Sequence, residues 1–124
     1  MTSYRHARKR AGPALIAVLV LTLVSLACST EADLQFESAM ALQSQDDHRA
    51  AVDAFTAVIG QDSEYAPAYL ERGRSLVQLG QYDSAISDFT EYLDRSPNDP
   101  RGRVGRAESF FLADNLTGAM SDID

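Results

Sequence analysis

Residues 66–99 read APAYLERGRSLVQLGQYDSAISDFTEYLDRSPND. This stretch matches the sequence on both sides of it at a constant offset of 34 residues. Identical residues pair it with the preceding segment: Ala32 with Ala66, Glu37 with Glu71, Leu42 with Leu76, Ala51 with Ala85, Phe55 with Phe89 and Thr56 with Thr90. The same register continues downstream through Ala107, Phe110, Leu116, Ala119, Met120 and Ile123. The sequence therefore divides into repeat units 32–65, 66–99 and 100–124.

Apolar residues recur within each unit at spacings of three and four, which predicts helices with one buried face. We expect helices at about 32–44, 48–60, 66–79, 82–95 and 100–113, and from 116 onward. Asp46-Asp47 and Gly80-Gln81 are predicted to end the first helix of their units, while Pro97 to Pro100 separates the second unit from the third. The fold class predicted is all-α, built from paired antiparallel helices.

A 34-residue unit of two helices resembles the tetratricopeptide repeat, abbreviated TPR. The second unit carries the best match, through Tyr69, Leu70, Gly73, Leu76, Gly80, Tyr82, Ala85, Ile86, Phe89, Leu93 and Pro97. Tyr92 stands where the family usually has Ala. The resemblance implies a right-handed solenoid of about 2.7 repeats, with the third repeat truncated. We therefore expect the sequence to be an N-terminal fragment of a longer protein.

The resemblance further implies a concave groove, lined by the first helix of each unit, that takes a peptide or a partner helix. The groove positions implied are Phe36, Met40, Leu70, Arg74, Val77, Gln78, Val104, Glu108 and Phe111. Alternatively, Phe111 and Leu112 do not line the groove and partly face a following repeat unit. A clamp for a terminal carboxylate, as in chaperone-adaptor members, is not expected, because only Arg74 fits it and Glu108 would repel an anion.

Arg101, Arg103 and Arg106 form a local basic patch in the third unit. Arg103 and Arg106 share a helical face, since residues three apart are neighbours on a helix. The patch has two interpretations: it binds an acidic partner, or its side chains pair with neighbouring acids.

The N-terminal residues 1–27 have the pattern of a secretory signal. Arg5, Arg8, Lys9 and Arg10 are followed by an uncharged apolar segment from Ala14 to Ala27. The residues Val24-Ser25-Leu26-Ala27-Cys28 resemble the lipobox of bacterial lipoproteins, although the pattern prefers Leu at position 25. The resemblance implies cleavage before Cys28, lipidation of Cys28, and a short tether at residues 28–31. An uncleaved signal anchor, or ordinary cleavage that leaves a free Cys28, are the alternatives. Ser29 would favour the outer membrane in a bacterium with two membranes.

Composition excludes several classes of protein. The chain carries a net charge of −7, divided between +4 in the head and −11 from Cys28 onward, where 7 basic side chains face 18 acidic ones. This acidic body argues against nucleic acid as a partner. One cysteine and two histidines provide neither a disulfide nor a cysteine-based zinc site. We assign His48, beside Asp46 and Asp47, to a turn between helices, and we predict no metal, cofactor or catalytic residue.

The function predicted is a non-enzymatic scaffold that is exported and anchored in the cell envelope through lipidated Cys28. Its partner would be a protein or peptide in the groove, belonging to another envelope protein. The alternative is an N-terminal TPR adaptor of a larger exported enzyme or regulator, with a catalytic domain beyond residue 124.

Overall fold

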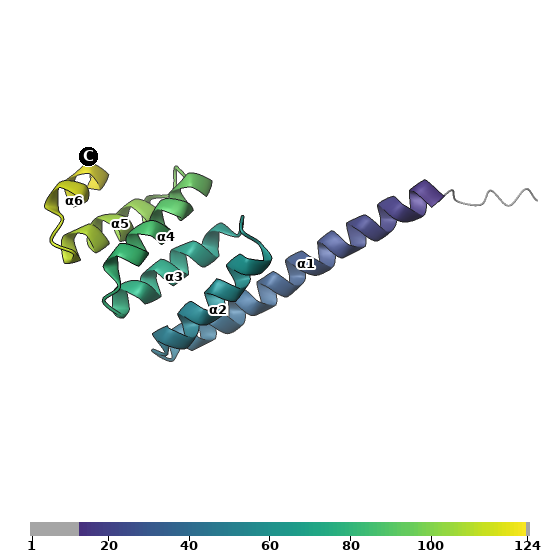
Figure 1. The fold of residues 1–124 in the computed structure, drawn as a ribbon, viewed down its shortest axis with the longest axis horizontal. Helices are drawn as coiled ribbons and strands as arrows, with labels where there is room; N and C mark the ends of the chain where they lie inside the picture. Colours follow the sequence, from purple (N-terminus) through teal and green to yellow (C-terminus); the bar gives the residue numbers. More distant parts are fainter. Residues whose placement is uncertain (1–12, 124) are drawn as a thin grey trace, which may run out of the picture.

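The computed structural model describes the backbone of residues 13–123 and the side chains of residues 17, 18 and 31–123. Within this range the chain forms helices and no strand: α1 (Pro13–Ser44), α2 (His48–Gln61), α3 (Ala66–Gln78), α4 (Tyr82–Arg95), α5 (Pro100–Leu112) and α6 (Leu116–Ile123). Each helix packs against the next one in the sequence, so the hairpins α1/α2, α3/α4 and α5/α6 stack side by side (Figure 1). The all-α prediction is confirmed.

Helix α1 is longer than the sequence pattern predicted. It begins at Pro13 rather than near residue 32, and its N-terminal half projects away from the stack (Figure 1). Proline is favoured at the first position of a helix, and residues 14–44 contain neither glycine nor proline to interrupt it. The expected tether at residues 28–31 is therefore part of the helix. Among the residues described, no helix combines the length and the apolar character needed to cross a membrane.

The basic head at residues 1–12 lies outside the described residues, as does the side chain of Cys28. The predicted cleavage and lipidation therefore stay predictions.

The turns inside the three hairpins have the same backbone conformation at equivalent positions of the repeat. Asp46, Gly80 and Asp114 have φ values of 61°, 72° and 59°. The next amide in each turn bonds back to a carbonyl of the preceding helix, from Asp47 to Leu42, from Gln81 to Leu76 and from Asn115 to Phe110, at 3.1, 2.9 and 2.8 Å. This is the Schellman arrangement that ends a helix with a left-handed residue. The turns predicted at Asp46-Asp47 and Gly80-Gln81 are present.

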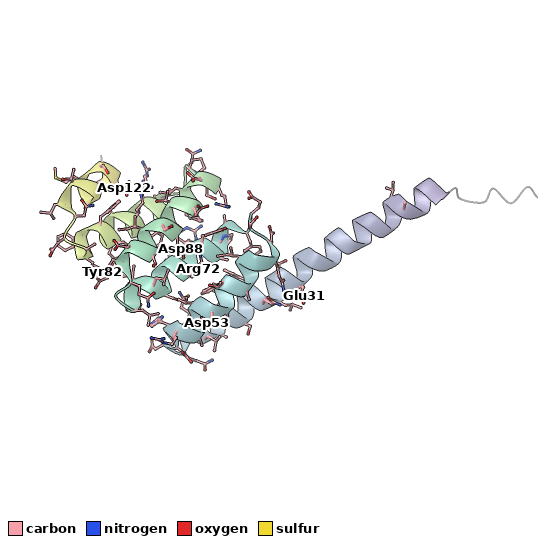
Figure 2. All side chains as sticks on the ribbon, viewed as in Figure 1. Glu31, Asp53, Arg72, Tyr82, Asp88 and Asp122 are labelled. Atoms are coloured by element: carbon pink, nitrogen blue, oxygen red, sulfur yellow. The ribbon has the colours of Figure 1, made fainter. Side chains whose placement is uncertain are left out.

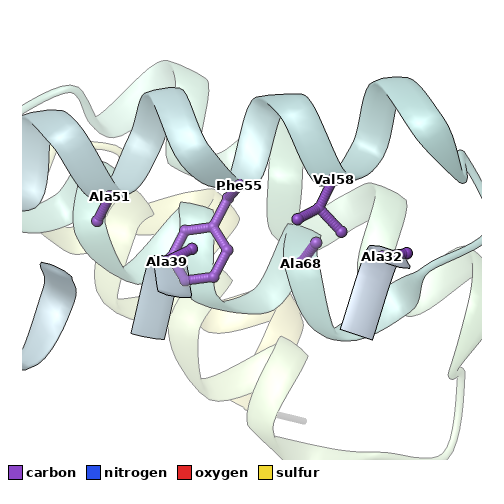
Figure 3. Packing of buried hydrophobic residues seen from close by; sticks show 6 residues of the cluster. All are labelled: Ala32, Ala39, Ala51, Phe55, Val58 and Ala68. Atoms are coloured by element: carbon purple, nitrogen blue, oxygen red, sulfur yellow. The ribbon is translucent and has the colours of Figure 1, made fainter. Parts of the chain in front are cut away.

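Hydrophobic side chains fill the space between consecutive hairpins. One cluster joins α1, α2 and α3 around Phe55 and Val58, with alanines at the close contacts (Figure 3). The second cluster centres on Phe89 of α4 and includes Tyr69 and Tyr92. Phe89 lies between two glycines: a Cβ on Gly73 would be 3.0 Å from its ring, and one on Gly105 would be 2.5 Å away. The glycines therefore allow α3 and α5 to approach this ring.

Ion pairs join the two helices of a hairpin, and a hydrogen bond to a threonine links each pair to the preceding hairpin. Arg72 in α3 and Asp88 in α4 lie side by side (Figure 2), and the guanidinium of Arg72 donates from Nε and Nη2 to the two carboxylate oxygens of Asp88, both at 2.7 Å. Its Nη1 donates to the Thr56 hydroxyl in α2 at 3.0 Å. Arg106, Asp122 and Thr90 repeat this arrangement in the following unit, at 2.7, 2.6 and 3.2 Å. We call each set a Thr–Arg–Asp clasp. Each clasp joins both helices of one unit to the second helix of the unit before it.

The first unit departs from this arrangement. Ser38 and Ala54 occupy the positions of the clasp arginine and aspartate. Leu34 occupies the position of Ala68 and Gly102, two residues that contact the preceding hairpin. Leu34 is 73% exposed, whereas Ala68 is fully buried. The outward face of α1 therefore differs from the faces through which α3 and α5 pack against the preceding hairpins.

The clasp predicts a large stability loss for Arg72→Ala. The Asp88 side chain is only 6% accessible, so this variant leaves a buried carboxylate without its partner. We expect the free energy of unfolding, measured in urea, to fall by about 3–5 kcal/mol. Arg103→Ala is the control, because Arg103 is exposed, and its loss should stay within about 0.5 kcal/mol. Equal losses for the two variants would contradict a structural role for the clasp.

Two glycine substitutions, one in a turn and one inside a helix, should change the free energy of unfolding in opposite directions. Gly80→Ala forces a side chain into the left-handed region and should lower the free energy of unfolding by about 1–2 kcal/mol. Gly60 lies in α2 with nothing within 4 Å of an added Cβ. Gly60→Ala should therefore stabilise the chain by up to about 1 kcal/mol through helix propensity. Thermal unfolding of both variants tests the difference in sign.

Candidate binding groove

The first helices of the hairpins lie next to one another along one side of the stack. Helix α1 contacts α3, and α3 contacts α5, in addition to their contacts with the intervening second helices. A pocket of about 290 Å³ opens between α3 and α5. Its lining consists of Arg74, Val77, Gln78, Phe89, Pro100, Arg101, Val104, Gly105 and Glu108. We call it the α3–α5 pocket.

The centre of the α3–α5 pocket is apolar. Gly105 has no side chain, and the ring of the almost fully buried Phe89 lies directly against it, so these two residues form the floor. Val77 is half-buried on one wall, and Val104 is 65% exposed on the other. An aliphatic side chain placed here would exchange water for contact with carbon atoms on both walls and the floor.

Arginines on both sides of the pocket are paired with carboxylates. Arg74 Nη1 lies 2.8 Å from Glu71 Oε1, and Arg101 Nη2 lies 2.6 Å from Asp99 Oδ2. Asp99 also accepts a hydrogen bond of 2.6 Å from the Tyr92 hydroxyl. The hydrogen bonds from Arg101, and then from Tyr92, hold the pKa of Asp99 well below its usual range. Asp99 therefore remains charged and continues to neutralise Arg101 at any physiological pH.

Glu108 is the remaining charged residue of the pocket. It is exposed, and it forms no hydrogen bond or ion pair with side chains in the described part of the chain. It lies four residues after Val104 on α5, which places it one helical turn away on the same face. The pocket therefore combines an apolar centre with one carboxylate that has no counter-ion among the residues that the structure describes.

Five of the nine predicted groove residues line the α3–α5 pocket: Arg74, Val77, Gln78, Val104 and Glu108. The other four are placed elsewhere. Phe36 and Met40 are half-buried against the first core cluster, where the Phe36 ring lies 5.6 Å from Phe55 and 5.3 Å from Tyr65 between centroids. Phe111 is 62% exposed in the last turn of α5, outside the pocket lining.

Leu70 requires a correction. It is only 2% exposed and belongs to the second core cluster, so it supports the groove from below and does not present a contact surface.

Tyr65 lies directly before the first residue of α3, and its hydroxyl donates a hydrogen bond to Asp33 Oδ1 in α1 at 2.8 Å. Burial, together with this hydrogen bond, raises the pKa of Tyr65 to about 12. The hydroxyl therefore stays protonated and ties α1 to the start of α3.

Sequence reasoning missed Phe89, Pro100 and Gly105 as pocket residues. The sequence pattern indicates only packing between units for Phe89, and only a weak point in its helix for Gly105. The repeat register does not identify them, because the contact of Phe89 with Gly73 and Gly105 arises only in the folded structure. A glycine beside a buried ring, on the groove side of a helix, leaves a hollow.

Of the two interpretations of the basic patch, the structure shows the internal pairing for two of its three arginines. Arg101 pairs with Asp99 and Arg106 with Asp122, while Arg103 is exposed. His48 is the first residue of α2, directly after the turn to which the sequence assigned it, and its Nε2 lies 3.8 Å from Asp46 Oδ1. Within the described residues, no three His, Cys, Asp or Glu side chains are grouped in a way that could hold a metal ion.

Comparisons with known protein families and solved structures support the same fold of paired helical repeats. The sequence model of the tetratricopeptide repeat matches residues 36–100 and 70–123. No curated protein sequence matches the chain. Among solved structures, the MamA protein superimposes with a TM-score of 0.72 at 22% identity, over 74% of this chain and 50% of MamA. The chain therefore spans half the length of that protein.

SycD, the type III secretion translocator chaperone of Yersinia enterocolitica, superimposes with a TM-score of 0.71 at 23% identity, over 73% of this chain and 69% of SycD. A further SycD structure, in complex with a peptide of the translocator YopD, gives a TM-score of 0.70 at 22% identity, with the same coverage. Likeness at this level of identity establishes the fold. Together with the family match over most of the sequence, it establishes that the chain belongs to the tetratricopeptide repeat family.

Proposed function

We propose that this chain is a non-enzymatic interaction module that binds a peptide or helix of another protein in the α3–α5 pocket. The observation that carries the proposal is the apolar hollow over Phe89 and Gly105, open to solvent between two first helices. Its volume of about 290 Å³ is at the lower end of the range for small-molecule sites, which suits one or two side chains of a peptide.

The fold supports the same conclusion. SycD, which has this fold, is known in complex with a peptide of YopD. The charged groups of the α3–α5 pocket also favour recognition over catalysis. Its arginines are held in ion pairs, and a guanidinium does not exchange a proton in the physiological pH range.

Substitution of Val104 tests the pocket. Val104→Glu places a charge on the apolar wall at a residue that is already 65% exposed, so the fold should be retained. We expect its affinity for a peptide selected on the wild-type chain to fall about tenfold, which corresponds to the burial of one aliphatic side chain. Fluorescence polarisation with the labelled peptide measures the affinity, and circular dichroism checks the fold.

Leu116→Glu is the matched control. Leu116 is 60% exposed on α6 and lies outside the pocket lining. This variant should bind the peptide as the wild type does. Equal losses for Val104→Glu and Leu116→Glu would place binding away from the α3–α5 pocket.

We further propose that the chain is exported and anchored in the cell envelope through a lipidated Cys28, with the outer membrane as its location in a bacterium with two membranes. The support is the basic head, the uncharged segment from Ala14 to Ala27, and the lipobox-like residues that end at the only cysteine. Several acyl chains on one cysteine would anchor the chain stably, whereas a single chain would not. The partner would then be another protein of the envelope.

Intact-mass spectrometry of the protein extracted from membranes tests the anchor. We expect a mass that begins at Cys28 and carries added acyl groups, and we expect Cys28→Ser to accumulate with residues 1–27 attached. Ser29→Ala is the control and should still be processed. An unmodified Cys28 would refute lipidation, and a retained signal segment in the wild type would identify an uncleaved anchor instead.

A further inference from the structure

We infer that the partner segment is cationic: an aliphatic side chain of the partner enters the α3–α5 pocket, and a lysine or arginine beside it pairs with Glu108. This inference rests on the proposed function, since it specifies the chemistry of the segment that this pocket binds. It follows from the balance of charge around the pocket, from the position of Glu108, and from the charge of the whole body.

The two arginines of the pocket do not provide a free anion site. Arg74 is neutralised by Glu71, whose side chain is only 10% accessible, and Arg101 is neutralised by Asp99. Asp99 is additionally held by the Tyr92 hydroxyl. An incoming carboxylate would have to compete with carboxylates that are already aligned on the two guanidinium groups.

The remaining charge is negative and is close to the apolar wall. Arg74 and Arg101 are balanced by Glu71 and Asp99, two acids outside the lining, so these four charges cancel and Glu108 is the charge that remains. Glu108 lies one turn from Val104 on the same face of α5. A basic residue adjacent to an aliphatic side chain that contacts Val104 is therefore within reach of the Glu108 carboxylate, whereas an acidic residue there would be repelled.

The charge of the body acts in the same direction over longer distances. The chain from Cys28 onward carries a net charge of −11. A field of this sign accelerates the approach of cationic segments and slows that of anionic ones. Local pairing and long-range attraction therefore select the same class of partner.

The test is a selection of peptides from a random dodecapeptide display library on the immobilised full-length chain. We expect the selected peptides to share a Leu, Ile or Met with Lys or Arg next to it. Selection on Glu108→Lys should retain the aliphatic residue and replace the basic neighbours by Asp or Glu. For one selected peptide, Glu108→Gln should weaken binding about two- to fivefold, as expected for loss of an exposed ion pair.

Asp53→Lys is the matched control, because Asp53 is an exposed acid on α2 and its substitution changes the net charge by the same amount (Figure 2). It should leave the selected sequences unchanged. If Asp53→Lys and Glu108→Lys alter the selection equally, pairing with Glu108 is refuted.

Two further outcomes separate the inference from the proposed function. Peptides that share the aliphatic residue but show no preference for basic neighbours would overturn the cationic partner and leave peptide binding in place. Failure to enrich any peptide over a Val104→Glu chain would overturn the proposed function itself.

Discussion

The Thr–Arg–Asp clasp is the interaction on which the arrangement of the hairpins depends. A guanidinium that donates two parallel hydrogen bonds to one carboxylate accepts little change in distance or angle, and its third contact to a threonine fixes the preceding hairpin as well. Because the side chains of Asp88 and Asp122 are almost inaccessible to solvent, a shift in register between the two helices of a hairpin would leave a buried charge unpaired. Hydrophobic contacts alone would tolerate such a shift more readily.

The clasps also determine the pocket, although no clasp residue lines it. They hold α3 against α2 and α4, and α5 against α4 and α6, and so fix the distance between α3 and α5. Phe89 then has a double role: it is a core residue, in contact with Gly73, and the floor of the hollow beside Gly105. A change at Phe89 would alter the packing and the recognition surface together, whereas Val104 and Glu108 can vary without affecting the core.

The sequence predicted the features that recur in every repeat unit. Helix boundaries and turns follow from apolar spacing and from residues such as Gly80, which tolerate a left-handed backbone. The clasps were missed because isolated Arg and Asp residues are usually solvent-exposed, and only the fold brings Arg72 to Asp88. The prediction for Leu70 was wrong because the register gives a helical face, not the depth of a side chain within it. The pattern shows Gly105 only as a local cost to its helix, since its contact with Phe89 depends on tertiary packing.

The different residues on the face of α1 have a consequence for self-association. Helix α6 exposes Leu116, Met120 and Ile123, and Ile123 occupies the repeat position of Phe89, which α5 covers on α4. A helix that packs in this way presents a small residue and an arginine, as α5 does with Gly102 and Arg106. The outward face of α1 presents Leu34 and Ser38 at those two positions. The outward face of α1 therefore lacks the small residue and the arginine through which α5 packs on α4, so a second copy would not add to α6 through α1 in that way.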